Sequence, residues 1–220
     1  MSRDKYNQGE SKNRKRYSKY NNNTHSKTQH PKKFEDYIIV LDYLPRGHVE
    51  SRTRSFKSEP IIQAIGTNYF TILELVPRKS HINKIKIKDK YYIGSGQREI
   101  IDHIKGRISH NELTANAKFE LEDTISKIIK DNEERYVNFF SNSKPITTRM
   151  HQLELLPGIG KKIMWEIINE RKKSRFDSFK DISARISKIP DPEIMILKRV
   201  LTELENEDKY YIFIRPPFEK

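Results

Sequence analysis

The sequence contains no cysteine, which excludes disulfide bonds, thiolate metal sites and thiol nucleophiles. Long apolar runs are also absent, since none approaches the ~18 residues that a membrane-spanning helix needs. The N-terminal stretch MSRDKYNQGE lacks the apolar core of a secretory signal. We therefore expect a cytoplasmic protein without a membrane partner.

Signatures of catalysis are missing as well. The seven histidines are scattered, with no two at the HxH or HxxxH spacing of metal ligands. No G-x-S-x-G, Walker loop or complete dinucleotide fingerprint occurs, and GSGQREI lacks the third glycine. The acidic runs ELED and DNEE are typical of solvated helix faces. We therefore predict no catalytic residue, no metal site, no cofactor and no enzymatic activity.

What the chain has in excess is positive charge. Lys and Arg total 43 against 30 Asp and Glu, a formal net charge of +13. Such an excess favours polyanionic partners, nucleic acid above all, with an anionic membrane surface as the weaker alternative. Only 35% of the 220 residues are hydrophobic, which is polar for a globular protein but leaves room for a core.

Much of the charge lies in residues 1–33, which hold ten Lys and Arg against two acidic residues and no Leu, Ile, Val or Phe. Such a segment buries too little apolar surface to offset its ordering entropy, so we predict a disordered basic arm. Arg14, Lys15 and Arg16 are interleaved with tyrosines, a pattern suited to phosphates and exposed bases. The alternative is a solubilising tail.

Residues 34–110 are predicted to form a small β-barrel. DYIIVLDYLP, from Asp36 to Pro45, is typical of a strand, and PIIQAIGTNYFTILELVPR indicates two strands joined at the hairpin signal GTN. HINKIKIKDKYYIG alternates Ile with Lys around a KDK turn. Short strands with polar loops and no intervening helix favour a small barrel or a strongly curved sheet.

The polar loop RGHVESRTRSFKSE is the candidate ligand surface of this barrel, because its cations have no core to serve. Its candidate nucleic-acid contacts are Arg46, Arg52, Arg54, Phe56 and Lys57. The strand aromatics offer a stacking surface in principle, although a core role is favoured for each of them. They are Tyr43, Tyr69, Phe70, Tyr91 and Tyr92.

From Gln97 the pattern is helical, beginning with QREIIDHIKG. Residues 111–144 are predicted as a connecting helix that starts after a Thr114 cap, and residues 145–208 as a helical domain. TTRMHQLELL is expected to be the first helix of a pair within that domain. Residues 209–220 contain KYYIFIRPPF, which we expect to return to the barrel as a strand, since a lone strand is unstable.

One stretch of the helical domain, LELLPGIGKKIMWEIINERKK, predicts a phosphate site as well as a corner. Pro157 ends one helix, Gly158 and Gly160 allow backbone angles closed to other residues, and Ile159 points into the apolar seam. The next helix begins with free amides beside Lys161 and Lys162, which suits an anion. Further cations end that helix, namely Lys172, Lys173 and Arg175.

These residues resemble a helix-hairpin-helix motif, a nucleic-acid-binding unit of many repair, recombination and RNA-processing proteins. The match runs from Leu155 to Ile182, with LLPGIGKK as the hairpin. The resemblance implies a backbone phosphate at Gly158, Gly160 and the following lysines. A second hairpin, ISKIPDPEI, has lost the glycines, which implies a packing role only. Some motifs of this kind are purely structural, which is the alternative here.

Over Phe34 to Phe218 the chain resembles an uncharacterised archaeal family of predicted RNA-binding proteins, a domain of unknown function. The resemblance is carried by DYIIVLDYLP, GSGQREIIDHIKGRI and VNFFSNSKPITTRMHQLELLPGIGKK. It implies an α+β fold with an oligonucleotide-binding-like (OB-like) barrel followed by a helix-hairpin-helix domain.

We therefore expect a non-catalytic protein that binds RNA, either structured or ribosomal, with ribosomal proteins as further partners. A DNA-binding repair or replication accessory is one alternative, because a hairpin contacts phosphate in either polymer. A protein-docking scaffold, with the arm only solubilising, is the other.

Overall fold

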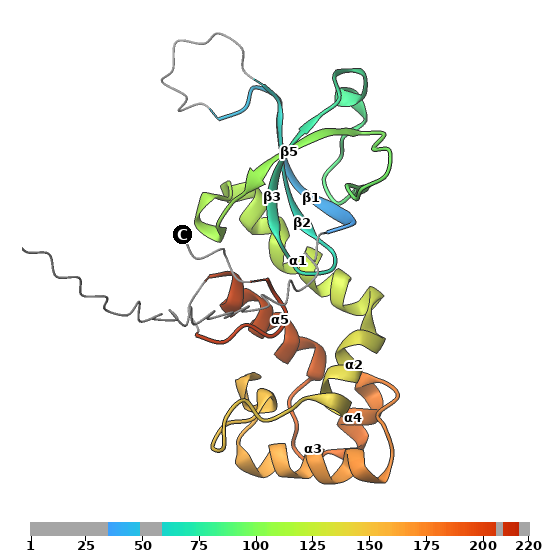
Figure 1. Cartoon of the computed structure of the whole chain (residues 1–220), viewed down its shortest axis with the longest axis vertical. Coiled ribbons are helices and arrows are strands. Elements are labelled where there is room, and N and C mark those ends of the chain that lie inside the picture. Colours follow the sequence, from blue (N-terminus) through green and yellow to red (C-terminus); the bar gives the residue numbers. More distant parts are fainter. Residues whose placement is uncertain (1–34, 49–58, 206–208, 216–220) are drawn as a thin grey trace, which may run out of the picture. The chain divides into compact units, whose positions relative to one another are not determined.

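The computed structural model describes residues 35–48, 59–205 and 209–215, all within the compact unit 34–220 (Figure 1). An antiparallel sheet comes first along the chain and helices follow it, which confirms the expected α+β class. The predicted basic arm, residues 1–33, lies outside the described residues, as do the C-terminal residues 216–220.

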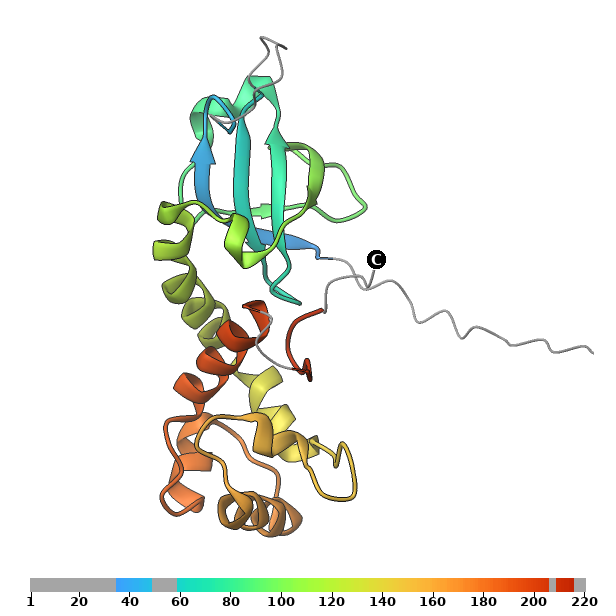
Figure 2. The ribbon, with the colours of Figure 1, turned by 90° about the vertical axis from the view of Figure 1, so that its left-hand side faces the viewer.

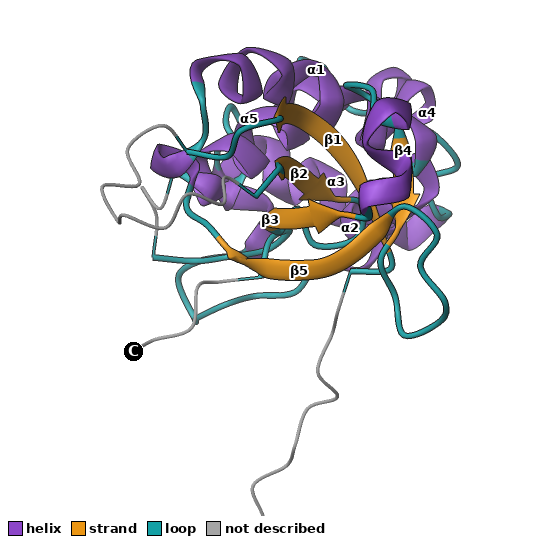
Figure 3. Cartoon of the chain, turned by 90° about the horizontal axis from the view of Figure 1, so that it is seen from above, coloured by secondary structure: helices purple, strands orange, loops and turns teal. Residues whose placement is uncertain are grey.

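The sheet has five strands in the order β4-β1-β2-β3-β5, with every neighbouring pair antiparallel. The strands are β1 (Tyr37–Leu44), β2 (Ile61–Gly66), β3 (Ile72–Pro77), β4 (Lys90–Tyr92) and β5 (Ile101–Arg107). Viewed from above, the sheet curls into a half-barrel with α1 beside β1 (Figure 3). This arrangement is consistent with an OB-like fold.

Strand β2 is buried at every position because both faces of the sheet are covered there. On the concave face, Ile38, Val40, Ile62 and Leu75 form a small closed core. Alternate residues of the neighbouring strands pack into the core shared with the helices. Burial on both faces explains why β2 and β3 are nearly continuous apolar runs.

The β2–β3 hairpin is confirmed, and a buried carboxylate holds its turn together. Glu35 accepts hydrogen bonds from the amides of Asn68, Tyr69 and Thr71, at 2.8, 3.0 and 3.1 Å. A Cβ at Gly66 would lie 2.0 Å from the Glu35 carboxyl carbon, so only glycine leaves room for this contact. The carboxylate compensates turn amides that have no partner within the ladder.

Two segments differ from the sequence-based expectation in the sheet region. QREIIDHIKG is no helix, since its second half is strand β5, paired with β3. Ile101 is buried in the concave core, whereas the next residues are exposed at the sheet edge. The alternating stretch before β4 begins as the 3-10 helix η1 (Lys79–Lys84) and then turns at Lys88, which has a φ of 70°.

The helices begin with α1 (Ala115–Asp131), whose N-terminus is capped as predicted, because the Thr114 hydroxyl accepts from the Ala117 amide. Asn132 has non-helical angles and separates α1 from α2 (Glu133–Asn142), so the predicted connecting helix is two helices. Helix α1 packs on β1 and on α5, which links the sheet to the helical region.

Two short 3-10 helices flank α1 and α2: η2 (His110–Glu112) precedes α1, and η3 (Gln152–Leu155) follows α2. The helical region ends with three helices, which are α3 (Lys161–Lys173), α4 (Phe179–Arg185) and α5 (Pro192–Leu204) (Figure 2). TTRMHQLELL is therefore wrong as a regular helix. Pro145 and His151 form an isolated bridge instead, and only one 3-10 turn precedes the glycine break.

Residues 209–215 are not a strand, because a buried carboxylate captures their amides. Glu203 of α5 accepts from Ile212, Phe213 and Ile214 at 2.8–3.0 Å, and from Arg199 Nε at 2.7 Å. Arg199 also donates to the Tyr210 carbonyl. The segment still reaches the sheet, since the Arg215 amide donates to the Tyr69 carbonyl at 3.4 Å.

Replacing Glu203 by Gln should lower the free energy of unfolding by about 3 kcal/mol, because Arg199 would lose its buried counter-charge. Urea unfolding followed by circular dichroism measures this loss. The matched control is Glu205→Gln, at the exposed C-cap of α5 two residues further along the chain. Equal stability of the two variants would contradict the role of the buried pair.

Candidate nucleic-acid interface

Two turns of the helical region share one backbone conformation, thirty residues apart in the chain. The first, residues 156–160, joins η3 to α3, and the second, residues 186–190, precedes α5. Each has a left-handed residue at its third position, Gly158 with φ 88° and Lys188 with φ 59°. We call them turn 1 and turn 2.

The two turns lie in contact through Gly158. A Cβ on Gly158 would come within 2.7 Å of Pro190 Cγ in turn 2, so the position excludes side chains by space as well as by φ. The next residue, Ile159, is buried in the core, as predicted. Turn 1 is thus anchored on one side and leaves its backbone open on the other.

Gly160 differs from the prediction, because its conformation does not require glycine. Its φ and ψ are −88° and 176°, ordinary extended angles, and an added Cβ would meet nothing within 4 Å. Gly160 is the N-cap of α3, and its carbonyl accepts the first helical bond, from the Met164 amide at 2.9 Å. Because Gly160 has no side chain, the space next to the first residues of α3 is left open.

The amides at the start of α3 have no protein acceptor within the described ranges. Gly160 supplies no side-chain cap, and Lys161, Lys162 and Ile163 are too early in the helix for an intrahelical bond. These three donors lie at the positive end of the helix dipole. An external anion fits this position electrostatically.

The start of α5 in turn 2 is occupied by the protein itself. The Asp191 carboxylate accepts from the amides of Glu193 and Ile194, at 2.9 and 3.4 Å. Pro190 and Pro192 have no amide hydrogen to offer. Turn 2 therefore carries a built-in carboxylate where turn 1 is open, which is the physical reason why ISKIPDPEI lacks a free anion site.

The two lysines after Gly160 are not equivalent. Lys161 Nζ turns back to the Glu154 carboxylate, at 2.8 and 2.9 Å, and to the Arg149 carbonyl at 2.6 Å. The hydrogen bond from Lys161 lowers the pKa of the Glu154 carboxyl. Lys162 is exposed and forms no ion pair with any residue that the structure describes. Of the predicted pair, Lys162 is the one available to a ligand.

Turn 1 borders an open cleft of ≈ 770 Å³ between the turn and α5. Gly158 and Gly160 form one side, and Lys198, Thr202 and Glu205 lie on the other. Lys198 is exposed and was not identified from the sequence, because nothing in the α5 pattern marks which of its faces meets turn 1. It adds a cation to the cleft beside turn 1, which the carboxylates of Glu154 and Glu205 also line.

The predicted cations at the far end of α3 form a separate site. Lys162 and Lys172 are ten residues apart, or about 15 Å along the helix axis. Lys173 pairs with Glu170, and Arg175 donates to Asn138 Oδ1 at 2.8 Å. The structure therefore does not bring Lys172, Lys173 and Arg175 together with the open helix start.

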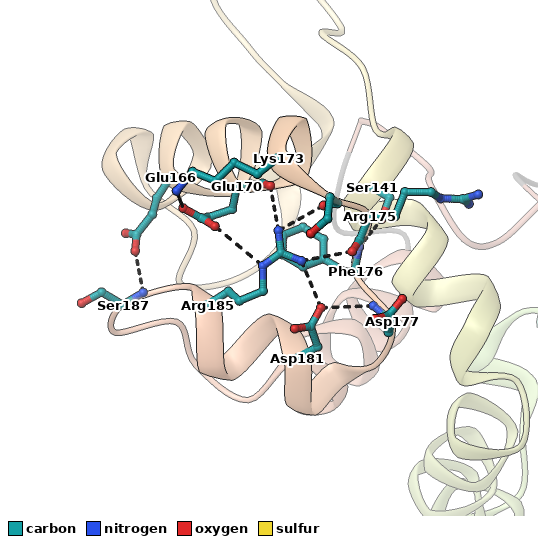
Figure 4. Close-up of polar contacts among 11 residues, drawn as sticks. Ser141, Glu166, Glu170, Lys173, Arg175, Phe176, Asp177, Asp181, Arg185 and Ser187 are labelled. Atoms are coloured by element: carbon teal, nitrogen blue, oxygen red, sulfur yellow. Dashed lines mark hydrogen bonds and ion pairs between the residues drawn. The ribbon is translucent and has the colours of Figure 1, made fainter.

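This far end is held in place by Arg185 of α4 (Figure 4). Its guanidinium donates to the carbonyls of Glu170, Ser174 and Arg175 at 2.7–3.0 Å. It also pairs with Asp181 at 3.1 Å and stacks over the Phe176 ring at 4.4 Å. Arg185 thereby links one carbonyl in the last turn of α3 to two carbonyls of the chain that leaves the helix.

The barrel candidates are only partly within the described residues. Arg46 is exposed just after β1, at the start of the long loop. The rest of the predicted contacts lie outside the described residues, namely Arg52, Arg54, Phe56 and Lys57 in the loop and Arg14, Lys15 and Arg16 in the arm.

None of the five strand aromatics singled out from the sequence is exposed, although Tyr37 of β1 is 43% exposed. Phe70 is fully buried, and Tyr43 is half-buried. The Tyr91 hydroxyl donates to Asp89, and desolvation with this hydrogen bond raises the pKa of Tyr91 to about 12. The Tyr92 hydroxyl accepts from the Gly96 amide at 3.0 Å. The core role favoured from the sequence holds for Phe70, and Tyr43 and Tyr91 pack partly buried against the sheet core, whereas Tyr69 and Tyr92 are half-buried outside both core clusters.

The sequence reasoning missed Trp165, whose side chain is 57% exposed on α3. The signal was readable, because Lys162, Trp165, Asn169 and Lys172 follow the three- and four-residue spacing of one helix face.

Within the described ranges, no group of three or more His, Asp and Glu side chains is placed to hold a metal ion. No helix of the described chain has the length and apolar character needed to cross a bilayer.

The geometry defines an α+β protein with a curled antiparallel sheet, consistent with an OB-like fold, followed by helices that present two paired turns. The chain belongs to the family described as "Protein of unknown function (DUF655)", which matches residues 34–215.

Two archaeal proteins are similar to this chain. "Uncharacterized protein MJ0038" of Methanocaldococcus jannaschii is 44% identical over 191 residues, 86% of this chain and 84% of that protein. The crystal structure of Af1531 from Archaeoglobus fulgidus has a TM-score of 0.73 and 46% identity, and it covers 82% of this chain and 100% of that one. The expected resemblance to an uncharacterised archaeal family is confirmed.

The two glycines of turn 1 should respond differently to alanine. Gly158→Ala should lower the free energy of unfolding by roughly 2 kcal/mol, because the side chain is strained at positive φ and meets Pro190. Gly160→Ala should lower it by less, about 0.5 kcal/mol, because alanine is a poorer N-cap than glycine although its Cβ meets no atom within 4 Å. Urea unfolding of both variants checks this, and similar losses at both positions would contradict the geometry.

His151 should make stability depend on pH. It is buried, and its Nδ1 accepts from the Leu153 amide at 3.1 Å. Burial, with Arg171 and Lys161 nearby, lowers its pKa from 6.5 against the opposite effect of Glu154. Its stabilisation is complete above pH 6.5 and declines as the pH falls toward the folded pKa, because the unfolded chain binds the proton first.

The free energy of urea unfolding should therefore fall more steeply between pH 7.5 and 5.5 in wild type than in His151→Asn, which keeps a side-chain acceptor. Parallel curves for the two proteins would show that His151 does not carry the effect.

Proposed function

We propose that this protein is a non-catalytic RNA-binding protein that holds a backbone phosphate at the start of α3. The observation that carries the proposal is the contrast between the two turns. In turn 2 the Asp191 carboxylate occupies the helix start, whereas in turn 1 the equivalent amides face open space beside Lys162. Turn 1 resembles the hairpin of a helix-hairpin-helix unit, whose amides bind phosphate.

Further contacts of the same kind support the proposal. Lys198 faces the cleft beside turn 1, Lys172 is exposed at the far end of α3, and Arg46 is exposed at the barrel loop. Contacts that are this far apart suit a long polyanion, because each weak site raises the effective concentration at the next. The whole chain carries a net charge of +13, which favours the same class of partner.

RNA is preferred over DNA because of the resemblance to predicted RNA-binding proteins. Structured or ribosomal RNA, with ribosomal proteins as neighbours, is the proposed setting, in the cytoplasm. The contrast between the turns would equally suit a DNA-binding accessory protein. Parallel titrations with RNA and DNA of the same sequence distinguish the two functions. Under the scaffold alternative neither polymer binds.

The variant Gly160→Asp tests the phosphate site directly, because it copies the Asp191 cap into turn 1. We expect RNA affinity to fall by about tenfold, the scale of one charge-assisted contact, while the melting temperature stays equal or rises. Fluorescence anisotropy with a labelled RNA at several salt concentrations measures both the affinity and the number of released counterions.

The matched control is Ser183→Asp, which adds the same charge on the exposed side of α4. Equal losses in the two variants would mean that net charge, and not the open helix start, explains the binding.

A further inference from the structure

The single tryptophan of the chain is exposed, although nothing in the fold requires it to be. Trp165 lies in the second turn of α3 with 57% of its surface accessible. Met164 and Ile167, on the opposite side of the helix, are buried at 3% and 0%. Tryptophan combines a large apolar ring with a polar N–H and is enriched at binding interfaces, so its neighbours on this face show what it could bind.

The side chains that flank Trp165 on the same face of α3 are polar or cationic. Lys162 precedes it by three residues, and Asn169 and Lys172 follow it by four and seven, the spacing of one helical stripe. All three are exposed. Within the described part of the chain, Lys162 and Lys172 take no part in an ion pair.

The acidic groups beside this stripe are already engaged. The Glu166 carboxylate accepts from the Ser187 amide at 2.6 Å, which ties α3 to turn 2 (Figure 4). Glu170 is paired with Lys173 and Arg185. The stripe therefore presents a flat aromatic surface between two cations, and its charge is complementary to an anionic partner that also carries flat apolar groups.

A single-stranded nucleic acid has this chemistry. Its bases stack on exposed aromatic rings while lysines neutralise the phosphates on either side. In a duplex the base faces are already stacked on each other, so a duplex cannot cover the indole in the same way. Lys162 belongs both to this stripe and to the open start of α3, so a strand with its phosphate there passes next to Trp165.

We propose that Lys162, Trp165, Asn169 and Lys172 form a binding surface for an unpaired nucleotide, whose base stacks on the Trp165 indole. The surface extends the proposed phosphate site along α3, and the inference rests on that proposed function. It assigns the substrate class: single-stranded RNA, or an unpaired segment of a structured RNA, in preference to a continuous duplex.

Intrinsic fluorescence tests the stacking, because Trp165 is the only tryptophan. A single-stranded 12-mer of mixed RNA sequence should quench it saturably, and the same strand annealed to its complement should quench it far less. Trp165→Leu should bind the single strand about tenfold more weakly, whereas Trp165→Phe should keep most of the affinity. An abasic strand of equal length should bind wild type and Trp165→Leu equally.

The two proposals fail in different ways. Equal affinity of Trp165→Leu and wild type for the single strand would overturn the stacking surface, while a weakened Gly160→Asp would still support the phosphate site. Unquenched fluorescence at saturating RNA would also overturn stacking. Absence of any RNA binding would overturn both. Quenching by a protein partner, with none by RNA, would assign the surface to protein docking instead.

Discussion

The close approach of Gly158 to Pro190 is the constraint on which the candidate site depends. It requires a residue without a Cβ and a left-handed backbone at the same position, and it sets turn 1 against turn 2. Turn 1 is anchored by this contact and by buried Ile159, and α3 begins beside it without a side-chain cap. Loss of the contact would free the turn to repack and would displace the start of α3.

Given that shared geometry, the difference between the turns is chemical. Asp191 gives α5 an internal anion, and two prolines remove the remaining donors. Gly160 gives α3 no cap, and Lys161 is drawn back to Glu154, so the helix start is left to an external anion and Lys162. One turn closes its helix start with its own carboxylate and the other leaves its helix start uncapped, so a single repeated unit has two different chemistries.

The sequence was sufficient where local and tertiary signals agree. β-Branched runs bounded by Pro and Gly marked β1 to β3, and Thr114 marked the start of α1. The sequence was insufficient where a residue far away in the chain determines the local structure. Strand β5 needs its partner β3, since its isoleucines suit either period, and residues 209–215 follow the Glu203 carboxylate instead of a sheet edge. The sequence shows both glycines of turn 1, but only the tertiary structure distinguishes Gly158, where positive φ and Pro190 exclude a side chain, from Gly160, where a Cβ would meet no atom.

The most direct test of the central claim is the amide spectrum of the ¹⁵N-labelled protein during titration with RNA. An anion at the start of α3 should shift the amide signals of Lys161, Lys162 and Ile163 saturably, and leave those of Glu193 and Ile194, already bonded to Asp191, nearly unchanged. RNA binding with unshifted α3 amides, or with equal shifts at both helix starts, would contradict the claim.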